Sequence, residues 1–110
     1  MSYQILLVDD HKIFRDGIKS ILERRDEFKV VGEAENGAEA VQFCKKARPD
    51  LVLMDIGLPG LNGIEATIDI MRHVPECKVV ILSMYDDESS VVGAIRSGAR
   101  AFVLKSASSE

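Results

Sequence analysis

The sequence lacks several features that would indicate particular classes of protein. Its longest apolar runs, such as 79–82, are too short to cross a membrane, and its first residues do not have the basic-then-apolar layout of a signal peptide. The only two cysteines, Cys44 and Cys77, have no metal-ligand or redox spacing, so we expect buried free thiols. These absences predict a cytoplasmic protein without a disulfide and without membrane contact.

An excess of basic charge is also lacking. The formal net charge is −4 at pH 7, whereas sequence-independent binding to nucleic acid needs a basic surface. We therefore expect that this sequence makes no direct contact with nucleic acid. With 110 residues, of which 46% are hydrophobic and 29% charged, the composition is that of one globular domain with its own core.

What the sequence does contain is a regular alternation of strand and helix patterns. Short, continuously apolar segments predict five strands at 4–8, 28–31, 51–54, 78–82 and 100–104. Helical spacing and capping residues predict helices over 12–24, over 38–47 after an Asn36-Gly37 turn, from Asn62 to Pro75, and from Asp86 or Asp87 to Gly98. Short connections between alternating strands and helices predict a doubly wound α/β fold, with a five-stranded parallel sheet covered on both faces.

Each predicted helix has an apolar stripe that can be read from the sequence. In the first, the stripe consists of Phe14, Ile18, Ile21 and Leu22, and Arg15 falls among the polar positions; in the third, Ile64, Ile68 and Met71 share a face. We expect Met54 and Met71 to fill the core. We expect His11 and His73 to be ordinary helix-end residues.

Polar residues follow four of the five strands. Asp9 and Asp10 follow the first strand, Asp55 the third, Ser83 the fourth and Lys105 the fifth. Each of these residues alone is typical of a cap, a turn or a solvated surface. Because parallel strands end at one edge of the sheet, where such folds bind ligands, we expect the five residues to converge.

The residue types in this group favour phosphoryl chemistry. Adjacent carboxylates repel and need a cation, and oxygen ligands favour a hard ion such as Mg²⁺. A carboxylate such as Asp55 can act as a nucleophile towards phosphorus. The Lys105 ammonium and the Ser83 hydroxyl can then stabilise the phosphoryl oxygens.

The sequence resembles the receiver domain of bacterial two-component response regulators over its whole length. The resemblance rests on Val-Asp-Asp-His at 8–11, Leu-Met-Asp-Ile-Gly-Leu-Pro-Gly at 53–60, Ile-Leu-Ser at 81–83 and Gly-Ala-Arg-Ala-Phe-Val-Leu-Lys at 98–105. Together with Ile-Phe-Arg-Asp-Gly at 13–17, the opening motif is most similar to the NarL/FixJ subfamily. Members of that subfamily usually carry a LuxR-type helix-turn-helix domain for DNA binding, which these 110 residues do not contain.

The resemblance implies a flavodoxin-like strand order of 2-1-3-4-5 and a role for each site residue. Asp55 would be phosphorylated by a sensor histidine kinase, with Asp10, Asp55 and the carbonyl of Gly57 on Mg²⁺ and Asp9 assisting through water. Lys105 would contact the phosphoryl group. The protein would be a switch with self-catalysed phosphotransfer and autodephosphorylation, and not a turnover enzyme.

The resemblance also implies a coupling between phosphorylation and an output surface. Ser83 would move towards the phosphoryl oxygen, and Phe102 would rotate inward. Many relatives have Thr and Tyr at these two positions and a shielding side chain at position 57, where this sequence has Gly. Ser can still donate a hydrogen bond, but Phe lacks the hydroxyl group, so its buried state would rest on apolar contacts alone.

Two other functions are compatible with the sequence. A receiver-like interaction module that works without phosphorylation is one, although all five site residues are retained. An aspartyl phosphatase on a similar core is the other, but such enzymes usually have a second Asp two residues after the first, where this chain has Gly57. The serine-rich tail at 106–110 resembles the start of a fifth helix, so we expect a receiver domain over 1–110 truncated there. The bare flank would favour either oligomerisation, including a homodimer, or marginal stability.

Overall fold

A computed structural model describes residues 3–55, 62–83 and 99–104, with the backbone alone for 83 and 101–104. Its centre is a sheet of five parallel strands in the order β2-β1-β3-β4-β5, which confirms the predicted topology. The strands are β1 (Tyr3–Val8), β2 (Phe28–Ala34), β3 (Leu51–Asp55), β4 (Lys78–Ser83) and β5 (Ala101–Leu104).

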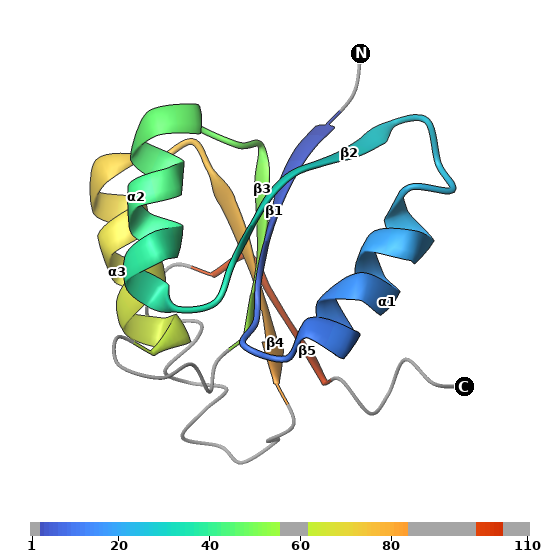
Figure 1. Cartoon of the computed structure of the whole chain (residues 1–110). Coiled ribbons are helices and arrows are strands. Elements are labelled where there is room, and N and C mark those ends of the chain that lie inside the picture. The colour runs from blue at the N-terminus through green and yellow to red at the C-terminus, as the bar shows by residue number, and fades with distance from the viewer. Residues whose placement is uncertain (1–2, 56–61, 84–98, 105–110) are drawn as a thin grey trace.

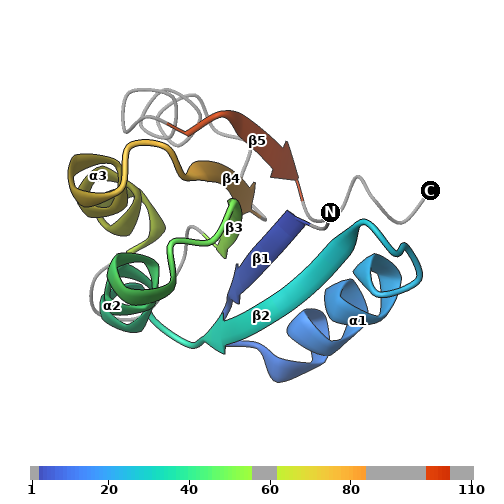
Figure 2. The ribbon, with the colours of Figure 1, turned by 90° about the horizontal axis from the view of Figure 1, so that it is seen from above.

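Helices cover both faces of this sheet (Figures 1 and 2). Helix α1 (Lys12–Leu22) lies on one face, and α2 (Gly37–Ala47) and α3 (Gly63–His73) pack side by side on the other. The predicted helix from Asp86 or Asp87 to Gly98 and the start of a fifth helix lie outside the described residues. Within the part of the chain that is described, no helix is both long and apolar enough to span a bilayer.

The starts of α2 and α3 follow from asparagine side chains. Asn62 accepts a hydrogen bond from the backbone N–H of Glu65 at 2.9 Å, and the Glu65 side chain accepts one from the backbone N–H of Asn62 at 3.3 Å, forming a capping box. Asn36 caps α2 in the same way, accepting from the backbone N–H of Glu39 at 2.9 Å. Asn36 is therefore an N-cap as well as a turn residue, and α2 begins one residue earlier than predicted.

Strand β2 is longer than the sequence predicts. The predicted end at residue 31 coincides with a register shift, since Ile5 pairs with Val30 but Leu6 pairs with Gly32. Beyond this irregularity, pairing with β1 continues to Ala34 even though glycine is a poor strand former. The glycine leaves room for the ring of Phe43 on α2, because a Cβ atom at Gly32 would lie only 2.6 Å from Cζ of that ring.

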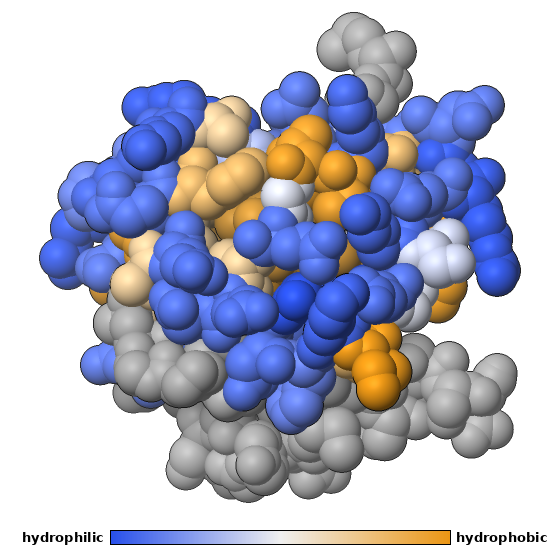
Figure 3. Space-filling model, viewed as in Figure 1, coloured by the Kyte–Doolittle hydropathy of each residue, from blue (hydrophilic) through white to orange (hydrophobic). Residues whose placement is uncertain are grey.

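The main core lies between the sheet and the α2–α3 layer. Alternate residues of the central strands point into it, including Leu6 and Val8, Val52 and Met54, and Val79 and Ile81. On the opposite face, beside α1, the strand residues Leu53, Val80 and Leu82 are half-buried. The view in Figure 3 is mostly polar, with apolar side chains visible between the charged ones over the middle of the molecule.

Two predicted helix faces were partly wrong. Ile21 is 57% exposed, whereas Arg15, predicted among the polar positions of α1, is buried. In α3, Ile64 and Met71 are half-buried but Ile68 is 40% exposed, and the buried face consists of small residues and one isoleucine: Gly63, Ala66, Thr67 and Ile70. Small side chains let α3 approach its neighbours closely, and the Thr67 hydroxyl is satisfied because it donates to the Gly63 carbonyl at 2.7 Å.

Both cysteines are buried and free, as predicted. The neighbouring Cys77 thiol and burial together raise the pKa of Cys44 above its ordinary value, so the Cys44 thiol remains protonated at neutral pH. These residues, like the fully buried Met54, act as packing groups.

Candidate metal centre

Acidic side chains meet at the carboxyl ends of β1 and β3. Val8 pairs with Met54, so the residues that follow them, Asp9 and Asp55, occupy adjacent positions at the edge of the sheet. One ligand atom from each of Asp9, Asp10, His11 and Asp55 lies within 4.8 Å of all the others. The predicted convergence of the three carboxylates is therefore confirmed.

The three carboxylates differ in their access to solvent. Asp9 and Asp55 are buried, at 3% and 5% exposure, whereas the side chain of Asp10 is 35% exposed. The cluster thus has a buried base and one open side. A ligand arriving from solvent would meet Asp10 first.

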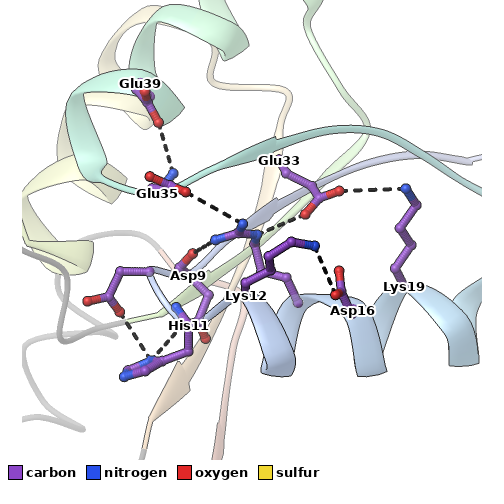
Figure 4. A network of polar contacts seen from close by, with 10 residues as sticks. Asp9, His11, Lys12, Asp16, Lys19, Glu33, Glu35 and Glu39 are labelled. Atoms are coloured by element: carbon purple, nitrogen blue, oxygen red, sulfur yellow. Dashed lines mark hydrogen bonds and ion pairs between the residues drawn. The ribbon is translucent and has the colours of Figure 1, made fainter.

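His11 belongs to this cluster, although its place in the sequence predicted an ordinary helix-end residue. Its backbone N–H donates to Oδ1 of Asp9 at 2.8 Å, and its ring Nδ1 lies 2.9 Å from the same oxygen and 3.1 Å from Oδ1 of Asp10 (Figure 4). One oxygen of Asp9 is therefore already engaged by His11. The position of His11 directly after the acidic pair was the only sequence signal for this contact.

His73 is different. It lies in the last turn of α3, as predicted, and its Nδ1 is 2.9 Å from the carbonyl oxygen of Asp69. A nitrogen facing a carbonyl acts as a donor, so His73 satisfies a backbone acceptor near the helix end.

Arg15 also lies near the site, although its place in the sequence predicted only a polar position on α1. Its Nε donates to Glu33 at 2.8 Å, its Nη1 donates to the backbone carbonyl of Asp9, and its Nη2 lies 3.7 Å from Glu35. The hydrogen bond to Glu33 raises the pKa of Arg15 above its ordinary value, and the same bond lowers the pKa of Glu33. Both groups are therefore fully charged at neutral pH.

The donor set of this cluster fits a hard divalent cation. Two unit charges 4.8 Å apart repel by roughly 3.5 kcal/mol at an effective dielectric constant near 20, so three carboxylates this close need positive charge. Carboxylate oxygens suit Mg²⁺, which keeps several waters and takes only one or two carboxylates directly. The solvent-facing side at Asp10 leaves room for such waters, so the residues present fit the ion.

The remaining predicted site residues are placed only by their positions in the sheet. Asp55 pairs with Leu82, and Ser83, the last residue of β4, pairs with Leu104, the last residue of β5. The ends of β3, β4 and β5 therefore share one edge with the acidic cluster. Phe102, the second residue of the outer strand β5, pairs with Ile81 of β4. Gly57 and Lys105, and the side chains of Ser83 and Phe102, lie outside the described residues.

Comparison with known proteins identifies the family. Residues 5–110 match the model of the response regulator receiver domain. The transcriptional regulatory protein DegU of Brevibacillus brevis is 46% identical over 102 residues, a match that covers 93% of this chain and 43% of DegU. The chain spans about half the length of the curated relatives it matches.

Solved structures agree with this assignment. A LuxR-family two-component response regulator from Aurantimonas sp. SI85-9A1 superposes with a TM-score of 0.91 at 38% identity, covering 96% of this chain and 76% of that one. The CheX–CheY complex of Borrelia burgdorferi, solved with BeF3 and Mg²⁺, matches with a TM-score of 0.88 at 28% identity, covering 94% of this chain and 78% of that one. The shared fold, the acidic cluster at the carboxyl edge of the sheet and the family match show that this chain belongs to the response regulator receiver domain family.

Proposed function

We propose that Asp55 accepts a phosphoryl group from a sensor histidine kinase in a reaction that depends on Mg²⁺. The observation that carries this proposal is the position of the Asp55 carboxylate, which is 5% exposed and within 4.8 Å of ligand atoms from Asp9 and Asp10. A carboxylate held among other carboxylates is poised to share a cation with them. The related CheY structure, which contains Mg²⁺ and the phosphoryl mimic BeF3, supports the same use of the site.

The roles of the three carboxylates follow from their surroundings. Asp10 is the open one, so it would hold Mg²⁺ directly together with Asp55 and the carbonyl of Gly57. Asp9 is buried, and its Oδ1 accepts hydrogen bonds from His11, so it would act through water. When bound, Mg²⁺ would supply positive charge to the phosphoryl oxygens as the group is transferred.

The chemical step is a displacement at phosphorus. A carboxylate oxygen of Asp55 forms the new bond to phosphorus while the bond from phosphorus to the donor atom breaks, and the bonding electrons leave with the donor. Lys105 and the Ser83 hydroxyl would stabilise the phosphoryl oxygens. The register supports this arrangement, because Asp55 pairs with Leu82, Ser83 follows Leu82, and Ser83 pairs in turn with Leu104, which precedes Lys105.

Small phosphodonors provide the test. Incubating the 110-residue chain with acetyl phosphate and Mg²⁺ should add one phosphoryl group, and tandem mass spectrometry should locate it on Asp55. Chelation of Mg²⁺ or the substitution Asp55→Asn should abolish the modification. The matched control is Asp50→Asn, because Asp50 immediately precedes β3 at its opposite end and its carboxylate accepts from the backbone N–H of Gln4. Modification of Asp55→Asn at the same rate as the wild type would contradict the proposal.

Phosphorylation would control transcription through a DNA-binding domain outside these 110 residues. The support is the match to transcriptional regulators of which the chain spans about half. In the proposed switch, Ser83 approaches the phosphoryl group and Phe102 reorients, which changes the partner surface around β5. DNA binding by the full-length protein should increase with BeF3 and Mg²⁺. Equal binding by the wild type and Asp55→Asn under both conditions would instead favour a module that works without phosphorylation.

A further inference from the structure

Arg15 is a buried charged residue that the proposed phosphoryl chemistry does not use. It is the fourth residue of α1, and its side chain is only 7% exposed. A buried guanidinium is unfavourable unless its N–H groups are paired. Its partners are the Asp9 carbonyl at the end of β1, Glu33 near the end of β2 and Glu35 just beyond it; Figure 4 labels these three partners.

These contacts fix the segment that carries the acidic pair. The Asp9 carbonyl that accepts from Arg15 belongs to the peptide group linking Asp9 to Asp10. On its other side, the Asp9 backbone N–H donates to the Ala34 carbonyl of β2 at 3.0 Å. The chain is therefore held against β2 immediately before Asp10, and the Arg15 contact fixes one side of the peptide group from which the Asp10 side chain follows.

We propose that Arg15 is a positioning residue for the metal centre, orienting the Asp9–Asp10 peptide so that both carboxylates face Asp55, with Glu33 holding its guanidinium in place. The proposal deepens the proposed function and rests on it, because it assumes that the acidic cluster binds Mg²⁺. Arg15 is not expected to touch the ion or the phosphoryl group. It acts through the backbone of Asp9, as groups outside the direct ligands of a metal commonly do.

The sign of the effect separates positioning from simple electrostatics. A guanidinium is a permanent cation, so its charge repels Mg²⁺ bound nearby. If charge alone mattered, removing Arg15 would strengthen Mg²⁺ binding. If the hydrogen bond to the Asp9 carbonyl orients the ligands, removing Arg15 will weaken Mg²⁺ binding in spite of the lost repulsion.

The experiment measures Mg²⁺ dissociation constants of the 110-residue chain by calorimetry and by NMR titration of the Asp10 amide. For Arg15→Met we expect a Kd raised on the order of tenfold or more. Arg15→Lys keeps the charge but loses the planar fork, so its Kd should also rise. Lys19→Met is the matched control. Lys19 lies on the same helix as Arg15, and its Nζ is 3.6 Å from the same Glu33 carboxylate, but the described contacts of Lys19 do not include Asp9. Its Kd should stay within about twofold of the wild type.

Folding is checked for each variant by circular dichroism and thermal unfolding. If Arg15→Met does not fold, Arg15→Lys decides the question, because it keeps the positive charge and would leave the Kd unchanged if charge alone mattered. Acetyl phosphate labelling gives a second readout: Arg15→Met should need more Mg²⁺ for half-maximal labelling of Asp55, with a rate at saturating Mg²⁺ close to that of the wild type.

Two failures remain distinguishable. A wild-type chain that binds no Mg²⁺ would overturn the proposed function and the role of Arg15 with it. A wild-type chain that binds Mg²⁺, combined with a folded Arg15→Met or Arg15→Lys variant that binds it equally or more tightly, would overturn the positioning role alone.

Discussion

Replacing Asp10 by Asn should stabilise the metal-free protein and destroy its response to Mg²⁺. Asp10 faces two other carboxylates, Asp9 and Asp55, with ligand atoms within 4.8 Å. Each repulsion would amount to roughly 3.5 kcal/mol at an effective dielectric constant near 20, but the 35% exposure of the Asp10 side chain screens it strongly. We therefore expect Asp10→Asn to raise the free energy of unfolding without metal by about 1–2 kcal/mol, or the Tm by roughly 5–10 °C.

Saturating Mg²⁺ should reverse this order. An ion that binds only the folded state adds about 2.7 kcal/mol of stability at a concentration of about 100 times its Kd. The wild type should gain this stabilisation, whereas Asp10→Asn should gain little because it lacks one of the proposed direct ligands. The substitution is nearly isosteric, and the amide oxygen can still accept from the ring of His11, so changes in packing should contribute little.

Urea unfolding followed by circular dichroism, with EDTA and with saturating Mg²⁺, measures both effects. Asp16→Asn is the matched control, because Asp16 is an exposed carboxylate on α1 paired with Lys12 at 3.1 Å. That variant should change stability by less than about 0.5 kcal/mol and should respond to Mg²⁺ like the wild type. The reasoning would be refuted if metal-free Asp10→Asn were less stable than the metal-free wild type. It would also be refuted if Mg²⁺ stabilised Asp10→Asn as much as it stabilises the wild type.

Three further predictions concern stability away from the acidic cluster. Arg15 lowers the pKa of Glu33. The stability that this pair contributes is therefore present above the ordinary glutamate pKa of about 4.3, and it is lost as the pH falls through the lowered value. The difference in urea stability between the wild type and Glu33→Gln should shrink over that pH range. Gly32→Ala should destabilise by about 1–3 kcal/mol in thermal unfolding, since its methyl group would overlap the Phe43 ring. Asn62→Ala removes a capping box and should cost about 1 kcal/mol, also measured by thermal unfolding.

Each of these three has a control in the same chain. Glu27→Gln changes an exposed carboxylate whose pKa is lowered by Arg25, so its effect on stability should be much smaller than that of Glu33→Gln. Gly17→Ala adds a methyl group where nothing lies within 4 Å, and it should stabilise α1 by about 0.5–1 kcal/mol. Asn62→Ser keeps an acceptor at the N-cap and should retain most of the stability. A Gly32→Ala variant as stable as Gly17→Ala would show that Phe43 moves aside freely.

The sequence was sufficient to predict the elements that depend on local pattern. Continuous apolar runs predicted all five strands within a few residues of their observed ends, and Asn62 predicted the start of α3. The convergence of Asp9, Asp10 and Asp55 could also be predicted, because parallel strands of one sheet must end at the same edge. The strand order came from the resemblance to receiver domains, since periodicity alone does not define which strands are neighbours.

Only the tertiary structure decided how Arg15 and β2 are arranged. By its position in the helix pattern Arg15 belongs with the polar residues, yet it is buried because Glu33, 18 residues further along the chain, and the Asp9 carbonyl satisfy its donors. Strand β2 continues through Gly32 because β1 pairs with it and Phe43 packs over it, which overrides a low local preference. Local pattern thus determined where the acidic side chains lie, while contacts between distant segments decided which residues hold them in place.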